Sequence, residues 1–147
     1  MAMKASELMT KNPACVTPQT TVQEAARLME REDVGSLPVV ESRDSMRLVG
    51  IVTDRDLALR VVARGESGST PVSSAMSSGN LACVHPEDDL DKVEHLMVEH
   101  QVRRVPVIDQ KSCIVGVIAQ ADLARELRSV GRKDFGKVVQ EISEPGR

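Results

Sequence analysis

Short apolar runs and amphipathic helical stripes alternate along the chain in the order strand, helix, strand, strand, helix, and this order occurs twice. The apolar runs have the length and the β-branched content of buried strands. They lie at 37–40, 48–52, 105–108 and 114–118, with a shorter extended stretch earlier in each half, at 15–16 and 83–84. Polar loops at 41–47 and 109–113 separate the paired runs. The pattern predicts an α+β chain built from short strands and helices.

The helices can be placed from a capping signal and from apolar spacing. Thr21 and Glu24 form a capping-box pattern, in which each side chain satisfies a free backbone amide of the other residue. A second helix begins near Asp54 in the first half and near Gln120 in the second. The apolar residues that recur at helical spacing are Val22, Ala25, Ala26 and Met29, then Leu57, Val61 and Val62, then Leu90, Val93 and Met97, and finally Leu123 and Leu127.

The two halves are copies of one repeat, because residues 9–60 align with residues 76–126 after one two-residue deletion in a polar loop. The matched pairs include Met9 with Met76, Cys15 with Cys83, Pro38 with Pro106, Gly50 with Gly116 and Asp56 with Asp122. A copy of about fifty residues is too small to bury its sheet alone, so we expect the two to pack face to face about a pseudo-twofold axis. We predict repeats at 5–63 and 71–128, joined by an exposed connector at 63–70.

The tail, residues 129–147, departs from the repeat and contains one further predicted helix. Residues 134–143 place Phe135, Val138, Val139 and Ile142 on one helical face. We expect this C-terminal helix either to cap the repeat pair or to bury its apolar face against another subunit.

Composition excludes several classes of function. The formal net charge is -3, which provides no broad positive field for a nucleic-acid backbone. The chain has no Trp, no Tyr and one Phe, so a planar ligand would lie between aliphatic side chains. A membrane span needs about 18 apolar residues, and no apolar run approaches that length. The opening residues lack the apolar core of a signal peptide. We therefore expect a cytoplasmic protein with no nucleic-acid or membrane partner.

Neither the cysteines nor the histidines form a pattern typical of a metal or catalytic site. Cys15, Cys83 and Cys113 include no C-x-x-C pair, so reduced and mostly buried thiols are expected. Cys83 and His85 share one face of a strand, but no close tetrahedral ligand set appears, and we predict no metal. The chain has no G-x-S-x-G, Walker or H-E-x-x-H motif, so we predict that it is not an enzyme.

Two strings in each copy resemble the cystathionine-β-synthase (CBS) domain. They are LPVV at 37–40 with VGIVTDRDLA at 49–58, and RVPVI at 104–108 with VGVIAQADLA at 115–124. Each copy has that family's hxP strand and the glycine and acid of its turn, and the first copy also has the hydroxyl residue between them. The resemblance covers about residues 5–128 and implies a β-α-β-β-α fold, pairing of the copies into one Bateman module, and association of two modules into a homodimer. It also implies that clefts between the copies bind an adenosine-type ligand.

Site A, by this resemblance, combines the turn of the first copy with strands of the second. Its residues are Gly50, Ile51, Thr53, Asp54, Asp56, Val84, Arg103, Arg104, Val105 and Pro106. Their chemistry suits a nucleotide: Gly50 permits close approach of the backbone, Thr53 offers a hydroxyl at a helix start, and Asp56 can accept both ribose hydroxyls. The guanidinium groups of Arg103 and Arg104 suit phosphate. Ile51, Val84, Val105 and Pro106 are the candidates to hold the base.

Site B combines the opposite halves and departs from the family pattern. Its residues are Val16, Thr17, Gly35, Ser36, Leu37, Pro38, Gly116, Val117 and Asp122. Ala119 replaces the hydroxyl residue of the turn, and Gly35 and Ser36 stand where the other copy has two arginines. We therefore expect site B to be the weaker site, either empty or suited to a ligand with less charge.

Two interpretations of the turn stay open. Thr53 and Asp56 also fit a capping box, so helix initiation alone accounts for their spacing. The ligand interpretation predicts a regulatory module that binds AMP, ADP or ATP, less readily S-adenosylmethionine or NAD, needs no obligatory cofactor and modulates a partner protein. The alternative is a ligand-free dimeric scaffold or stress-response interaction protein.

Overall fold

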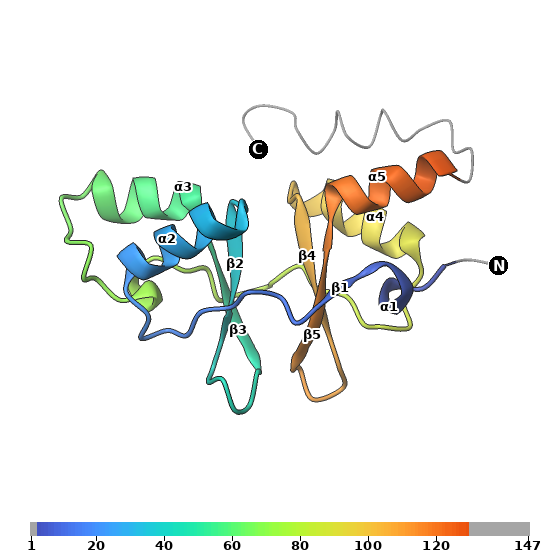
Figure 1. The fold of residues 1–147 in the computed structure, drawn as a ribbon, viewed down its shortest axis with the longest axis horizontal. Coiled ribbons are helices and arrows are strands. Elements are labelled where there is room, and N and C mark those ends of the chain that lie inside the picture. The colour runs from blue at the N-terminus through green and yellow to red at the C-terminus, as the bar shows by residue number, and fades with distance from the viewer. Residues whose placement is uncertain (1–2, 130–147) are drawn as a thin grey trace. The chain divides into compact units, whose positions relative to one another are not determined.

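The computed structural model describes residues 3–129, and these residues form two compact units. The β4–β5 unit contains residues 3–13, 82–110 and 115–129, and the β2–β3 unit contains residues 14–81 and 111–114. Figure 1 labels their elements. The order of strands and helices confirms the predicted mixed fold with two tandem repeats. The predicted tail helix at 134–143 lies outside the described residues.

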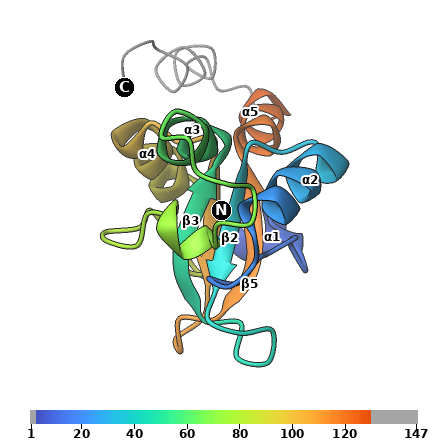
Figure 2. The same cartoon turned by 90° about the vertical axis from the view of Figure 1, so that its left-hand side faces the viewer.

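The β2–β3 unit follows the predicted order of elements and is seen from the side of α2 and α3 in Figure 2. Its elements are α2 (Val22–Glu32), β2 (Ser36–Val40), β3 (Leu48–Thr53), α3 (Asp54–Leu57), the π-helical turn η1 (Ala58–Val62) and the 3₁₀ turn η2 (Val72–Ser74). The strands β2 and β3 pair antiparallel, with Leu37 opposite Val52. The predicted extended stretch is present as a parallel bridge between Val16 and Val39.

The β4–β5 unit repeats this arrangement. Its elements are α1 (Ala5–Leu8), β1 (Thr10–Lys11), α4 (Leu90–His100), β4 (Arg104–Ile108), β5 (Ile114–Ala119) and α5 (Gln120–Ser129), of which Ile114 is counted with the other unit. The three strands form one sheet in the order β1-β5-β4. Val84 bridges Val107 in parallel, just as Val16 bridges Val39 in the other unit.

Aliphatic side chains alone form the two cores of the described residues. The core of the β2–β3 unit contains Val16, Val22, Ala25, Met29, Leu37, Val39, Val52, Val61, Val72 and Ala75. The core of the β4–β5 unit contains Ala5, Val84, Leu90, Val93, Met97, Val105, Val107, Ile118, Leu123 and Leu127. Each fully buried Val or Leu stabilises its unit by about 1.5–3 kcal/mol relative to exposure. The predicted helical stripes therefore supply apolar side chains to both cores, together with the strands of each hairpin.

Both long helices begin and end in the same way. The Glu24 amide donates to Thr21 Oγ1 at 3.1 Å, and the Lys92 amide donates to Asp89 Oδ1 at 3.1 Å. Both C-termini close with a left-handed residue, Asp33 in α2 and Gln101 in α4. For Thr21 and Glu24, only this half of the predicted capping box forms. The prediction that the Glu24 side chain also accepts from the Thr21 amide is wrong.

Each unit is completed by an entry segment that the sequence places at the start of the other repeat. We call residues 5–11 and 72–77 the entry segments. Residues 5–11 lie in the β4–β5 unit, where the Ala5 amide donates to the Asp88 carbonyl at 2.7 Å and Thr10 pairs with Val117. Residues 72–77 lie in the β2–β3 unit, where Ser77 and Ile51 exchange two backbone hydrogen bonds of 2.9 Å. The compact units and the sequence repeats therefore do not have the same boundaries.

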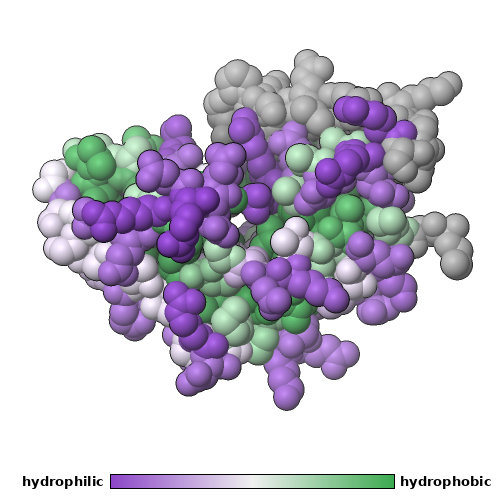
Figure 3. Space-filling model, in the orientation of Figure 1, coloured by the Kyte–Doolittle hydropathy of each residue, from purple (hydrophilic) through white to green (hydrophobic). Residues whose placement is uncertain are grey.

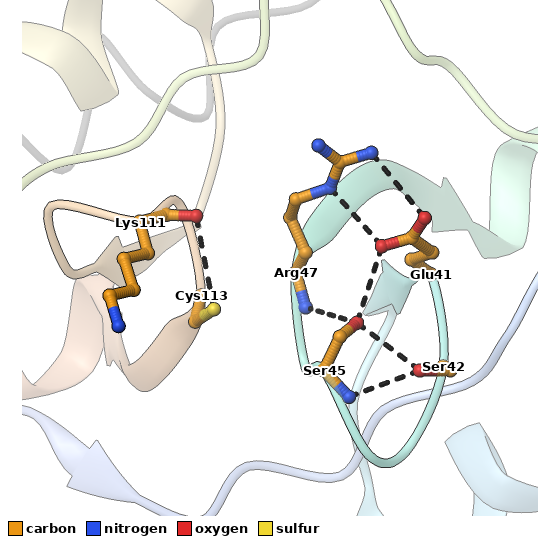
Figure 4. A network of polar contacts seen from close by, with 6 residues as sticks. All are labelled: Glu41, Ser42, Ser45, Arg47, Lys111 and Cys113. Carbon is orange, nitrogen blue, oxygen red and sulfur yellow. Dashed lines mark hydrogen bonds and ion pairs between the residues drawn. The ribbon is translucent and has the colours of Figure 1, made fainter.

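The tip of the β4–β5 hairpin belongs to the β2–β3 unit, where residues 111–114 lie beside the tip of the β2–β3 hairpin. Arg47 and Cys113 form an antiparallel bridge, and the Leu48 amide donates to the Ser112 carbonyl at 2.9 Å. Figure 4 shows the side chains around this bridge, including the ion pair of 3.3 Å between Arg47 and Glu41. Because both partners of that pair are about half exposed, the backbone bonds hold the tips more firmly than the charges do.

Two predicted core positions are wrong. Ala26 is exposed on α2, and the Val62 side chain is 75% exposed beside Leu59, which is 48% exposed. Of the two valines that the prediction placed on this stripe, the structure buries Val61, and Val62 points outward from the π-helical turn η1. Figure 3 shows hydrophobic atoms on the surface over this part of the β2–β3 unit.

Candidate functional site

The turn between β3 and α3 is a complete capping box. The Asp56 amide donates to Thr53 Oγ1 at 3.0 Å, and the Thr53 amide donates to Asp56 Oδ2 at 2.9 Å. The turn therefore starts α3 without a ligand, as expected if Thr53 and Asp56 serve helix initiation. Because the capping box uses Asp56 Oδ2, a ligand could bind only the second carboxylate oxygen, Oδ1.

That second oxygen has no hydrogen bond within the part of the chain that the structure describes. Asp56 Oδ1 faces the Arg60 guanidinium, with Nε at 3.9 Å, which is an ion pair too long for a hydrogen bond. The Asp56 side chain is 16% exposed and the Arg60 side chain 42%. Asp56 thus presents one fixed and partly exposed acceptor at the start of a helix.

Gly35 and Ser36 lie directly beside this turn, in the same unit. Ser36 is opposite Thr53 in the β2–β3 ladder, and the Asp54 amide donates to the Gly35 carbonyl at 2.9 Å. A Cβ atom at Gly35 would lie 3.1 Å from Asp54 Oδ2, so a carboxylate rests against the glycine. The structure therefore brings together residues that sequence analysis divided between site A and site B.

The equivalent corner of the β4–β5 unit has the opposite charge. The Gln120 amide donates to the Arg103 carbonyl at 2.7 Å, which places the exposed Arg103 and the half-exposed Arg104 beside the start of α5. Asp122 is paired with Arg125, whose Nη2 lies 2.6 Å from Asp122 Oδ1. With Ala119 in place of a hydroxyl residue, this corner has two arginines and no capping box from its own turn.

The glycines of the two turns are covered by protein. A Cβ atom at Gly50 would lie 2.9 Å from Met76 Sδ and 2.9 Å from the Ser77 carbonyl oxygen. A Cβ atom at Gly116 would lie 2.5 Å from Met9 Sδ. Each glycine therefore makes room for an entry segment, which accounts for its absent side chain without a ligand.

Most of the aliphatic candidates belong to the cores of their own units. Val84 and Val105 are fully buried in the β4–β5 unit, and Pro106 is buried beside them on β4. Val16, Leu37 and Pro38 are buried in the β2–β3 unit, and Val117 is buried on β5. The candidates with partial exposure are Ile51 and Thr17, of which Thr17 bonds Thr20 through its amide and its hydroxyl.

The cysteines are not poised for chemistry. Burial raises the pKa of the Cys15 thiol from 9.0 to about 11, although the Arg43 charge lowers it slightly, and burial likewise raises the pKa of Cys83. Both thiols are protonated near neutral pH and are weak nucleophiles and weak metal ligands there. No group of three or more His, Cys, Asp or Glu side chains gathers to hold a metal ion among residues 3–129.

Sequence reasoning missed three residues that surround the turn. Arg60 faces Asp56 from η1, while Met76 and Ser77 cover Gly50 from the entry segment. Only the alignment of Met76 with Met9 pointed to a shared role for the methionines. Arg60 has no counterpart in the repeat, because Glu126 stands at its equivalent position.

The chain matches known proteins along most of its length. A model of the CBS domain matches residues 5–63 and 72–129. The CBS domain-containing protein YhcV of Bacillus subtilis is 42% identical over 137 residues, which are 93% of each chain. No helix among residues 3–129 is long and apolar enough to cross a membrane.

Two solved structures are similar to the whole repeat pair. Hypoxic response protein 1 of Mycobacterium tuberculosis is 33% identical over 92% of each chain. A crystal structure of Hypoxic Response Protein I with two coordinated zinc ions has a TM-score of 0.76 at 32% identity, over 85% of this chain and 99% of that one. The crystal structure of CBSX2, a protein of Arabidopsis thaliana, in complex with AMP has a TM-score of 0.72 at 25% identity, over 88% of this chain and 98% of that one. The matched repeats, the relatives and the fold agree, and the chain belongs to the family of proteins with paired CBS domains.

Proposed function

We propose that this CBS pair is a regulatory module that binds an adenine nucleotide, with AMP as its first candidate. The observation that carries the proposal is the Asp56 carboxylate, which is fixed through Oδ2 by the capping box while Oδ1 accepts no hydrogen bond from the described residues. A rigid acceptor at a helix start suits a ribose hydroxyl. The complex of CBSX2 with AMP supports adenosine chemistry in a similar fold.

The charges of the two corners support a nucleotide over an uncharged nucleoside. Arg103 and Arg104 offer guanidinium donors to a phosphate in the β4–β5 unit, and Asp54 offers a repelling carboxylate beside Gly35 in the other unit. The proposed module acts in the cytoplasm as a homodimer and changes the affinity of a partner protein when the nucleotide binds.

A ligand-free scaffold is the second candidate, and the capping box favours it. Thr53 and Asp56 bond each other at both ends of the box, and Asp122 is paired with Arg125, so each of these residues already has a structural role. This candidate predicts that nucleotides leave the stability of the protein unchanged.

The thermal midpoint of unfolding separates the two candidates. A nucleotide-free preparation is heated with and without AMP at about 100 times the dissociation constant, where a bound ligand stabilises the fold by about 2.7 kcal/mol. The variant Asp56→Asn keeps an acceptor for the Thr53 amide and removes the charge, so the AMP-induced shift falls while the protein stays folded. The matched control is Asp89→Asn, which changes a capping carboxylate of α4 outside the proposed site. Equal shifts in both variants, or no shift in the unchanged protein, would refute the nucleotide proposal.

A further inference from the structure

The helix after the Asp56 turn is wound differently in the two repeats. In the β2–β3 unit it widens into η1 (Ala58–Val62), where the Ala63 amide donates to the Ala58 carbonyl at 2.8 Å, five residues back. In the β4–β5 unit α5 continues as a regular α-helix from Gln120 to Ser129. Single π-helical turns are rare and occur frequently at functional sites. Arg60 is the central residue of this widened turn.

Arg60 contacts both the turn and an entry segment. Its Nη1 donates to the Ala75 carbonyl at 3.1 Å and to the Met76 carbonyl at 3.2 Å. Its Nε lies 3.9 Å from Asp56 Oδ1. The guanidinium is thus held by two charge-assisted hydrogen bonds on one side and by a carboxylate on the other.

The carbonyls that Arg60 binds are next to the residue that pairs with β3. Ser77 exchanges two backbone hydrogen bonds of 2.9 Å with Ile51, and Met76 Sδ covers Gly50. A shift of the Arg60 guanidinium therefore moves the Ala75 and Met76 carbonyls, which lie immediately before Ser77. Residues 75–77 belong by sequence to the second repeat, so a change at Asp56 reaches the segment that leads into that repeat.

The second repeat lacks this connection. Glu126 stands at the position equivalent to Arg60, and Asp122 is paired instead with Arg125, three residues ahead on the exposed side of α5. The Arg125 side chain is 75% exposed, and it donates to Asp122. Arg125 is therefore a matched control: an arginine beside the equivalent acid that holds no entry segment.

We propose that Arg60 is a positioning residue that transmits ligand binding from Asp56 to residues 75–77. The inference rests on the proposed function and deepens it by naming how the site is regulated. A ligand hydroxyl that donates to Asp56 Oδ1 changes the ion pair between that oxygen and Arg60. Arg60 then holds the carbonyls of Ala75 and Met76, which precede Ser77, more tightly. Binding of a nucleotide at the β3–α3 turn then slows the opening of the Ile51–Ser77 pair.

Hydrogen exchange of the Ser77 and Ile51 amides tests the inference, with AMP as the probe. Without AMP, Arg60→Ala is expected to raise exchange of the Ser77 amide about tenfold, because two hydrogen bonds to a charged donor are lost at a partly exposed place. Arg60→Lys restores part of this protection, because an ammonium group can donate to one of the carbonyls. Arg125→Ala leaves Ser77 unchanged. Thermal unfolding verifies that every variant is folded.

The decisive comparison uses AMP at a concentration that saturates each variant, as verified by calorimetric titration. AMP is expected to slow exchange at Ser77 in the unchanged protein and in Arg125→Ala, and to have no effect there in Arg60→Ala although it still binds. If AMP binds Arg60→Ala and slows Ser77 as in the unchanged protein, the inference is overturned and the proposed function stands. If AMP does not bind the unchanged protein, the proposed function fails and the inference fails with it.

Discussion

The two turn glycines provide a quantitative test of how the entry segments pack. A Cβ atom at Gly50 would meet Met76 Sδ at 2.9 Å and the Ser77 carbonyl oxygen at 2.9 Å. A Cβ atom at Gly116 would meet side-chain atoms of Met9, the closest being Sδ at 2.5 Å. The shorter contact is at Gly116, yet we predict that Gly50→Ala is the more destabilising substitution.

The reason is the mobility of the atoms that must move. Met9 is half-buried, and rotation of its unbranched side chain moves Sδ and Cγ away from a new methyl group at small cost, which leaves only its Cβ atom at 3.0 Å. The Ser77 carbonyl is fixed by its backbone hydrogen bonds with Ile51, so an alanine at position 50 must displace the strand pairing itself. Overpacking of this kind costs about 1–3 kcal/mol. We expect about 3 kcal/mol for Gly50→Ala and about 1 kcal/mol for Gly116→Ala, each reduced by about 0.5 kcal/mol through the less flexible unfolded chain.

Urea unfolding of four single and two double variants measures these values. In the Met9→Ala background, Gly116→Ala should cost less, because the two closest atoms, Met9 Sδ and Cγ, are removed and only the Cβ contact at 3.0 Å is left. In the Met76→Ala background, Gly50→Ala should remain costly, because the Ser77 carbonyl stays in place. The coupling free energy is therefore large for the pair Gly116 and Met9 and small for the pair Gly50 and Met76. A larger cost for Gly116→Ala than for Gly50→Ala, or full rescue of Gly50→Ala by Met76→Ala, would refute the packing described for the entry segments.

Further predictions concern the exposed η1 surface and the buried thiol. Val62→Ala changes the free energy of unfolding by less than about 0.5 kcal/mol, whereas Val61→Ala lowers it by about 2 kcal/mol, because Val62 is 75% exposed and Val61 is 4% exposed; equal losses in urea unfolding would contradict the η1 geometry. Because burial raises the pKa of Cys15 to about 11 in the folded protein, the unfolded chain loses the thiol proton first as pH rises. The stability contributed by the protonated thiol is then present below about pH 9 and lost between pH 9 and 11, by about 2 to 3 kcal/mol. The difference in unfolding free energy between the unchanged protein and Cys15→Ala measures this loss, and a difference that does not vary with pH would contradict it.

Periodic patterns carried most of the fold prediction. The stripe of Val22, Ala25 and Met29 and the apolar runs at 37–40 and 48–52 predict helices and strands that the structure confirms, because burial on one face imposes those spacings. Val62 was misplaced because successive helical residues point about 100° apart, so it does not share the buried face of Val61 in the π-helical turn η1. Nothing local in the sequence marks such a turn.

The exchange of the entry segments was beyond sequence reasoning for a different reason. The alignment of Met9 with Met76 establishes that the two residues are equivalent, but equivalence does not decide which unit each segment completes. The contact of Gly50 with Met76 was missed for the same reason, since Met76 lies far along the chain. Arg60 was missed because it is absent from the repeat and is identified only by its contacts with Asp56, Ala75 and Met76.

Titration calorimetry of the nucleotide-free protein with AMP at pH 7 tests the central claim most directly. The account predicts saturable binding of AMP to the unchanged protein, binding weaker by about tenfold or more in Asp56→Asn, and unchanged binding in Asp89→Asn, because a charged acceptor of the ribose hydroxyls contributes about 1.5–3 kcal/mol. Binding of equal strength in Asp56→Asn would remove Asp56 from the site. An absence of saturable binding by the unchanged protein would contradict the claim that this CBS pair is an adenine-nucleotide module.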